Sequence, residues 1–300
     1  MQIDFDKLRH FFDEKNINTV LPMIKEKISE TELLSIIEDF DGVIAGDDPF
    51  TYKVFEKAKK LKVVSKWGTG IDSIDLDAAR HFNIKICNTP NAFSHPVADT
   101  TLAFMLSFAR RVIETDRQMK QGKWDKIKGH TLSEKTLGII GLGNIGTQVA
   151  KRAHAFNMKI LANDIKNIHP IILEQYDIQM ATKSEIYENA DYITVHCDLN
   201  ESSYHLLNRE AFEQMKHKPY IINTARGGHV SLVDLRKALE SGVISGAGLD
   251  VFEAEPIAAD NPLLKRDDVI LAPHNSNSSQ KYWDLVHQNT IKNLFKHLGE

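Results

Sequence analysis

The sequence predicts an α/β fold with two doubly wound domains, each a parallel sheet covered by helices on both faces. Short runs that are apolar throughout alternate with helix-length amphipathic segments, which is the pattern of parallel strands buried on both sides. Ten such runs suit two sheets better than one, and 300 residues allow two domains of ordinary size. A break near residues 90–97 separates the first four runs from the later six.

These ten runs are the predicted strands, in chain order. The first four are INTVL (17–21), DGVIAG (41–46), LKVVSKWG (61–68) and IKICNTP (84–90). The later six are TLGIIGLG (136–143), MKILAND (158–164), DYITVHC (191–197), PYIINTA (219–225), ISGAGLD (244–250) and VILAP (269–273).

Three segments between and beyond these strands have helical spacing. Residues 5–16 predict a first helix, and residues 280–299 predict a last helix that returns to the first domain. After the break at Thr89-Pro90-Asn91, Pro96 stands at a favourable first position for a long helix over residues 97–122. We expect that long helix to cross between the two domains.

Composition excludes several classes of protein. The 37 basic and 41 acidic residues give a net charge of −4 without a basic block, which argues against nucleic-acid or membrane-surface binding. Cys87 and Cys197 stand far apart without metal-ligand spacing, which argues against a disulfide scaffold and a metal site. The N-terminus does not resemble a signal peptide, and no apolar run reaches the roughly 18 residues of a membrane span. We expect a cytoplasmic protein with a small-molecule partner.

A glycine loop, Gly141-Leu142-Gly143-Asn144-Ile145-Gly146, follows one predicted strand and opens a helical pattern. The first glycine permits a tight turn, the second lets a pyrophosphate approach the backbone, and the third allows close helix packing. Asp164 ends the next predicted strand, 23 residues after Gly141, where an acid can accept the ribose hydroxyls of NAD. No arginine follows this acid directly, so the loop predicts NAD rather than NADP.

Four later strands end in polar residues, at His196, Arg226, Asp250 and His274. Ligands of open parallel sheets bind beyond the carboxyl ends of the strands, so these side chains predict a reaction site. Each has a simpler interpretation, since Arg226 is also typical of a surface turn and His196 of a structural or cofactor contact. Glu255 is equally typical of a solvated loop.

In this order after the glycine loop, "INTARGGHV", "GAGLDVFEAEP" and "LAPHNS" resemble the motifs of the D-isomer-specific 2-hydroxyacid dehydrogenases, most closely the phosphoglycerate dehydrogenase-like branch. The resemblance covers roughly residues 40–290. It implies a flavodoxin-like substrate domain built from both chain ends, residues 1–95 and 276–300, and an inserted Rossmann NAD-binding domain, residues 96–275. The family usually opens with a strand, whereas here MQID runs directly into a helical pattern.

The resemblance also assigns roles to residues. It implies that His274 is the general acid/base, that Glu255 pairs with it, and that Arg226 binds the substrate carboxylate and its keto or hydroxyl oxygen. The backbone of Gly68-Thr69-Gly70 would hold the substrate carboxylate. Thr224 would line the nicotinamide pocket, and Asp250 would bond the nicotinamide carboxamide.

Elementary chemistry agrees with these roles. Hydride transfer at a carbon bearing oxygen needs a proton at that oxygen, and an unperturbed histidine pKa of about 6.5 suits this, the more so beside a carboxylate that raises the pKa. Arginine suits bidentate binding of a planar carboxylate. We therefore predict an NAD-dependent dehydrogenase that interconverts a D-2-hydroxy acid, such as 3-phosphoglycerate or a related acid, and its 2-keto acid.

Several alternatives stay open. An NAD(H)-binding regulatory protein of the corepressor type would share the architecture without metabolic turnover, and an amino-acid dehydrogenase would need a catalytic lysine that the sequence does not offer. Lys66 either favours a substrate phosphate or second carboxylate or is simply solvated. The apolar residues 102–109 either help form the homodimer that the resemblance implies or lie in the core. Asn275-Ser276-Asn277 stand where the family carries small or apolar residues, and we expect them to influence specificity.

Overall fold

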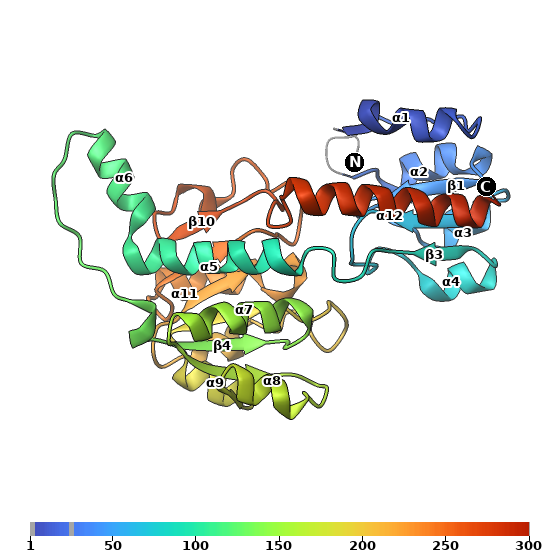
Figure 1. Cartoon of the computed structure of the whole chain (residues 1–300). Helices are drawn as coiled ribbons and strands as arrows, with labels where there is room; N and C mark the ends of the chain where they lie inside the picture. The colour runs from blue at the N-terminus through green and yellow to red at the C-terminus, as the bar shows by residue number, and fades with distance from the viewer. Residues whose placement is uncertain (1–3, 24–26, 300) are drawn as a thin grey trace. The chain divides into compact units, whose positions relative to one another are not determined.

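The computed structural model describes residues 4–23 and 27–299. The chain forms two compact units, Met1–Phe93 with Ser278–Glu300, and Ser94–Asn277. Each unit has one parallel sheet with helices packed on both faces (Figure 1), which confirms the predicted fold class. Among the described residues, no helix combines the length and the apolar character that a membrane crossing requires.

The first unit contains a three-stranded sheet in the order β1-β2-β3. Its strands are β1 (Gly42–Ala45), β2 (Val63–Lys66) and β3 (Lys85–Cys87). Its helices are α1 (Phe5–Asp13), α2 (Glu30–Ile36), η2 (Ile37–Asp39), α3 (Tyr52–Lys57), α4 (Leu76–His81) and α12 (Gln280–Leu298). Successive residues of a strand point to opposite faces, so Val63 packs with α1 and α12, whereas Val64 packs with α2, α3 and α4.

The prediction of a first strand over residues 17–21 is wrong. Asn16 has a left-handed φ of 53°, and the N–H of Ile17 donates to the carbonyl of Phe12 at 3.0 Å, so the chain turns at the end of α1. Val20 and Leu21 are then 57% and 45% exposed. Without a core to bury it, this apolar run forms no strand. Residues 1–3 of the MQID segment lie outside the described residues.

In place of the one helix predicted over residues 97–122, the chain forms two helices, α5 (Ser94–Arg110) and α6 (Val112–Lys120). Helix α5 begins two residues before Pro96. Arg111 between them has a left-handed φ of 55°. The carbonyl of Ala109, which would accept a bond from the next turn of a continuous helix, accepts the N–H of His130 at 3.0 Å instead. The returning chain therefore ends α5, and no residue of α6 is buried.

The second unit contains a seven-stranded parallel sheet in the order β10-β9-β8-β7-β4-β5-β6. Its strands are β4 (Thr136–Ile140), β5 (Lys159–Asn163), β6 (Ile178–Met180), β7 (Tyr192–Val195), β8 (Tyr220–Asn223), β9 (Gly246–Leu249) and β10 (Val269–Leu271). The other helices are η3 (Leu132–Glu134), α7 (Asn144–Ala155), α8 (Pro170–Gln175), α9 (Lys183–Asn189), α10 (Arg209–Glu213), η4 (Gly227–His229), α11 (Leu232–Glu240) and η5 (Pro262–Lys265). Helices α5 and α7 cover one face, and α9, α10 and α11 cover the other.

Strand β6 was not predicted from the sequence. It has three residues at the sheet edge, and only Ile178 is buried, so no apolar run marks it. The strand order reverses between β4 and β7, because the chain winds outward from β4 to β6 and then returns to the other side of β4. Such a reversal is where open α/β sheets bind their ligands.

Candidate active site and dinucleotide site

Strand register brings the predicted site residues of the second unit to one edge of the sheet. Ile140 pairs with Val195, Asn223 with Leu249, and Leu249 with Leu271. The residues that follow these strands therefore emerge together at the carboxyl edge. They include the glycine loop, His196, Thr224, Asp250 and His274, which the sequence placed at strand ends.

The glycine loop has the geometry of a phosphate cradle. Gly141 has a φ of 97°, and a Cβ there would lie 2.4 Å from the backbone nitrogen of Cys197. A Cβ at Gly146 would lie 2.1 Å from the carbonyl oxygen of Gly141, whereas a Cβ at Gly143 would meet nothing within 4 Å. Gly143 is the N-cap of α7 and provides no side-chain cap, and Asn144 and Ile145 open that helix. The helix N-terminus thus presents its amides where an anion can bind.

Asp164 follows β5 and is hydrogen bonded to the glycine loop. Its Oδ2 accepts the N–H of Leu142 at 2.7 Å, and its Oδ1 accepts the N–H of Lys166 at 2.8 Å. Each carboxylate oxygen can accept more than one hydrogen bond, so these contacts leave capacity for a ribose hydroxyl. Sequence reasoning found the residue but missed that it also holds the loop.

We expect substitutions at two glycines to separate cofactor binding from stability. Gly146→Ala forces its methyl group against the Gly141 carbonyl, and we expect it to lower the free energy of unfolding by about 1–3 kcal/mol. Gly143→Ala has room in the structure, so it should leave that free energy within about 0.5 kcal/mol while placing a methyl group in the cradle. Denaturant unfolding and NADH fluorescence titration measure the two effects. Equal NADH affinity in Gly143→Ala and wild type would contradict the cradle.

His196 follows β7 and is neutral in the folded protein. Burial lowers its pKa to about 3, with the nearby imidazole of His229 as a smaller cause. Its Nε2 lies 2.8 Å from the hydroxyl of Thr194, and its backbone N–H donates to Ile140 at 2.7 Å. These contacts support a structural role beside the loop, and the predicted cofactor contact of His196 stays a prediction.

Arg226 lies in a tightly held turn after β8. Asn223, which is fully buried, donates from Nδ2 to the carbonyl of Arg226 at 2.8 Å and accepts the N–H of Ala225 at 3.1 Å. The hydroxyl of Thr224 lies 3.1 Å from that of Thr101 on α5. Sequence reasoning did not single out Asn223, although a polar residue at the end of the apolar run YIIN was an available signal.

Glu255 and His274 form a hydrogen-bonded pair. Oε2 of Glu255 lies 2.9 Å from Nδ1 of His274, and both side chains are 20% exposed. Oε1 of Glu255 accepts the N–H of Phe252 at 2.8 Å, which fixes the orientation of the carboxylate. The structure therefore brings together two of the three predicted catalytic residues, which are 19 positions apart in the chain.

Gly68, Thr69 and Gly70 belong to the first unit, where they follow β2. Gly68 has a φ of 119°, and its carbonyl accepts the N–H of Thr89 at 2.8 Å. The carbonyl of Thr69 accepts a bond from Asn88 at 2.6 Å, and its hydroxyl donates to Thr89 at 2.9 Å. Asn88 and Thr89, which follow β3, thus hold this predicted substrate loop in place.

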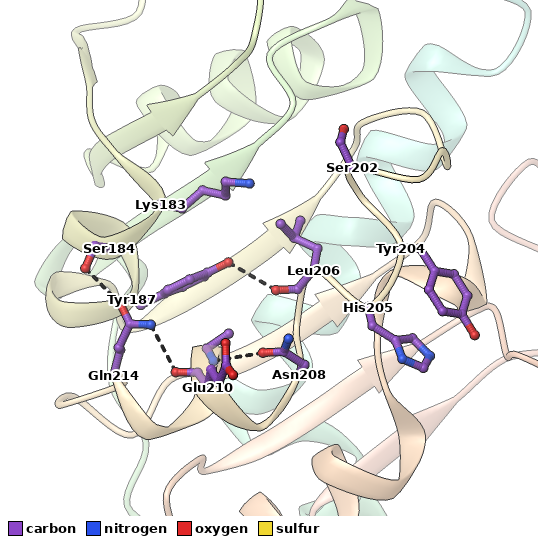
Figure 2. Close-up of a pocket in the computed structure, with 11 residues that line it drawn as sticks. Lys183, Ser184, Tyr187, Ser202, Tyr204, His205, Leu206, Asn208, Glu210 and Gln214 are labelled. Carbon is purple, nitrogen blue, oxygen red and sulfur yellow. Dashed lines mark hydrogen bonds between the residues drawn. The ribbon is translucent and has the colours of Figure 1, made fainter.

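A polar hollow of about 380 Å³ lies elsewhere on the second unit (Figure 2). Its lining comes from α9, α10 and the chain before α10, and it includes none of the predicted site residues. Several lining groups bond one another, such as the hydroxyl of Tyr187 to the carbonyl of Leu206 and that of Ser184 to Gln214. We assign no ligand to this hollow.

Residues 102–276, more than half of the chain, match the family described as "D-isomer specific 2-hydroxyacid dehydrogenase, NAD binding domain". The chain belongs to this family. A hydroxypyruvate reductase of Thermotoga maritima is 38% identical over 285 residues, which are 93% of this chain and 92% of that protein. A D-3-phosphoglycerate dehydrogenase of Methanocaldococcus jannaschii is 41% identical over 258 residues, which are 85% of this chain and 49% of that protein. The solved structure of an Aquifex aeolicus D-lactate dehydrogenase, complexed with NAD and lactic acid, matches with a TM-score of 0.86 and 26% identity, over 97% of this chain and 91% of that one.

This D-2-hydroxyacid dehydrogenase family member is an NAD-dependent oxidoreductase, which confirms the predicted cofactor and enzyme class. Independently of these relatives, the residues of the glycine loop fit NAD. Gly143 leaves an open cradle, the N-terminus of α7 has no side-chain cap, and Asp164 stands at the end of the neighbouring strand. Bound NAD supplies the acceptor or donor of the hydride.

Proposed function

We propose that this D-2-hydroxyacid dehydrogenase interconverts a D-2-hydroxy acid and its 2-keto acid, with His274 as the general acid/base. The observation that carries the proposal is the 2.9 Å contact between His274 and Glu255, at the sheet edge that also carries the glycine loop. Glu255 occupies Nδ1 of the ring, so Nε2 is the atom that exchanges a proton with the substrate oxygen. The carboxylate also stabilises the imidazolium form, which is the acid needed for reduction.

Arg226 and a loop of the first unit have proposed roles in binding the substrate. We assign Arg226 to the substrate carboxylate and its adjacent oxygen, because a guanidinium binds a planar carboxylate through two hydrogen bonds. The backbone of Gly68, Thr69 and Gly70 is assigned to the same carboxylate. Thr224 is assigned to the nicotinamide pocket. Residues 1–95 with 276–300 form the substrate domain of this proposal, and residues 96–275 form the NAD-binding domain.

The test is a panel of 2-keto acids and D- and L-2-hydroxy acids, assayed by NADH absorbance with NAD and NADP. We expect turnover with D-hydroxy acids and NAD. A protein that binds NADH but turns over no member of the panel would contradict the proposal and favour the regulatory alternative. The relatives named above are all enzymes, so no observation favours that alternative.

For the substrate, we propose a small 2-keto acid without a phosphate, such as hydroxypyruvate or glyoxylate, in preference to the 3-phosphoglycerate class. The support is Lys66, which ends β2 two residues before Gly68 and is 4% exposed. Its ammonium lies 2.9 Å from the carboxylate of Asp47. Because the pair is neutral overall, Lys66 adds little attraction for a second anionic group on the substrate.

We expect Asp47→Asn to shift this preference, because it leaves the charge of Lys66 uncompensated. The ratio of kcat/KM for phosphohydroxypyruvate to that for hydroxypyruvate should rise about tenfold, the effect of one charge-assisted hydrogen bond. Asp41→Asn is the matched control, since Asp41 forms an exposed pair with Lys62 at the other end of the same strands. An unchanged ratio in Asp47→Asn would argue that Lys66 does not influence the substrate.

We also propose that two copies of the chain associate through α6 and the residues after it. This helix buries no residue, and Ile113 and Trp124 are 49% and 82% exposed, an apolar surface that a second copy would cover. The double substitution Ile113→Asp with Trp124→Ala should convert dimers to monomers in light scattering. Ile171→Asp, at an apolar residue of α8 that is 63% exposed, should leave the mass unchanged. A monomeric wild-type protein would contradict the proposal.

We also propose a cytoplasmic location, which the small number of cysteines, two in the sequence, supports.

A further inference from the structure

The backbone of His274 adopts an uncommon conformation. His274 has a left-handed φ of 51°, a value that a minority of residues other than glycine adopt. Its backbone N–H donates to the carbonyl of Asp250 at 2.7 Å, at the point where β10 ends. Contacts to the two residues that follow, Asn275 and Ser276, can stabilise this conformation.

The carboxylate of Asp250 provides that support. Its Oδ1 accepts the N–H of Asn275 at 2.8 Å, and its Oδ2 accepts the N–H of Ser276 at 2.9 Å. Asp250 is fully buried, and its own N–H donates to the carbonyl of Asn223 at 3.0 Å. Two consecutive N–H groups that converge on one buried carboxylate form a strong charge-assisted contact.

We infer that Asp250 is a positioning residue that holds the His274 turn in its left-handed conformation. The inference rests on the proposed function for its catalytic consequence, but the anchoring itself does not. It adds to the contact with the nicotinamide carboxamide that the resemblance implies, because each carboxylate oxygen that accepts a bond from the turn can accept another. An asparagine in place of Asp250 would present an NH₂ group to one of the two N–H donors, so that bond would be lost.

Hydrogen exchange tests the anchoring without any assay of activity. In wild-type protein the amides of Asn275 and Ser276 should be protected in fragments that cover residues 273–279. In Asp250→Asn they should exchange at least about tenfold faster, the result expected from the loss of about 1.4 kcal/mol of local stability. Asp191→Asn is the matched control. Asp191 directly precedes β7, at the amino ends of the strands, and its carboxylate accepts the N–H of Thr136. Unchanged exchange in Asp250→Asn would overturn the inference.

Kinetics then separate the two roles of Asp250. If it positions His274, Asp250→Asn should lower kcat about 100-fold, the cost of a displacement of about 1 Å. The analogue with 3-acetylpyridine in place of nicotinamide lacks the amide donor, so the fall in kcat should persist with this analogue if its cause is the position of His274. A wild-type kcat together with a tenfold weaker Kd for NADH would leave Asp250 only the carboxamide contact and overturn the positioning role.

A second variant keeps the inference testable if Asp250→Asn folds poorly. Asp250→Ser, like Asp250→Asn, keeps one acceptor, but its hydroxyl proton can rotate away from the second N–H, so its exchange rates and kcat should fall between those of wild type and Asp250→Asn. Values equal to wild type would overturn the inference. If the wild-type protein turned over none of the acid panel, the proposed function would fail while the exchange result still decided the anchoring.

Discussion

Replacing His274 with alanine is expected to lower kcat/KM for reduction of a 2-keto acid by about 10²- to 10⁴-fold, because it removes the group that supplies the proton. The Kd for NADH should stay near the wild-type value, since cofactor binding does not depend on that proton. Single-turnover oxidation of NADH under excess keto acid measures the chemical step. His217→Ala is the matched control, as His217 is an exposed histidine of the second unit.

Glu255→Gln distinguishes the proposed acid/base role from a purely structural role of His274. The amide keeps the shape of the side chain but removes the negative charge 2.9 Å from Nδ1, so the imidazolium is less favoured. Reduction requires the imidazolium, and it should therefore decline with rising pH at a lower pH than in wild type. The profile of kcat/KM against pH measures this shift. A wild-type rate in His274→Ala, or an unmoved profile in Glu255→Gln, would refute the assignment.

Gly227→Ala is expected to impair both stability and catalysis. A Cβ at this position would lie 1.9 Å from the carbonyl carbon of Phe252 and 2.0 Å from its oxygen. The overlap can be relieved only if the turn that carries Arg226 separates from the segment that leads to Glu255. We expect the free energy of unfolding to fall by about 1–3 kcal/mol, and kcat to fall about 100-fold because the catalytic groups move by about 1 Å.

Gly228→Ala provides the matched control for this prediction. A Cβ at Gly228 would first meet the side chain of Leu199 at 3.0 Å, and a leucine side chain can move more easily than backbone. Its unfolding curve and kcat should remain close to wild type. Comparable losses in both variants would show that the turn tolerates no added side chain, and that the close approach of Gly227 to Phe252 is not the cause.

The sequence predicted strands well where burial on both faces requires a short run of apolar residues. Runs such as LKVVSKWG and DYITVHC form strands because both of their faces are covered. The expectation that an apolar run forms a strand was wrong for residues 17–21, where Val20 and Leu21 are exposed. It also missed β6, where only Ile178 is buried. Apolar content therefore predicts a strand only when the rest of the fold supplies two layers to cover it.

The long predicted helix illustrates a second limit. Nothing in residues 108–113 breaks the helical pattern, yet the helix ends at Arg110, because His130 takes the carbonyl of Ala109. The partner lies 21 residues further along the chain. A local reading of sequence cannot anticipate a hydrogen bond of that range.

The sequence by itself determined the α/β class and the glycine loop with its acid, because each depends on residues that are neighbours in the chain or one strand apart. The ordered motifs likewise pointed to Arg226, Glu255 and His274. Only the tertiary structure decided that Glu255 reaches Nδ1 of His274, that Asn223 holds the Arg226 turn, and that Asp250 holds the turn after β10. These contacts depend on the register of parallel strands, which joins residues far apart in sequence at one edge of the sheet.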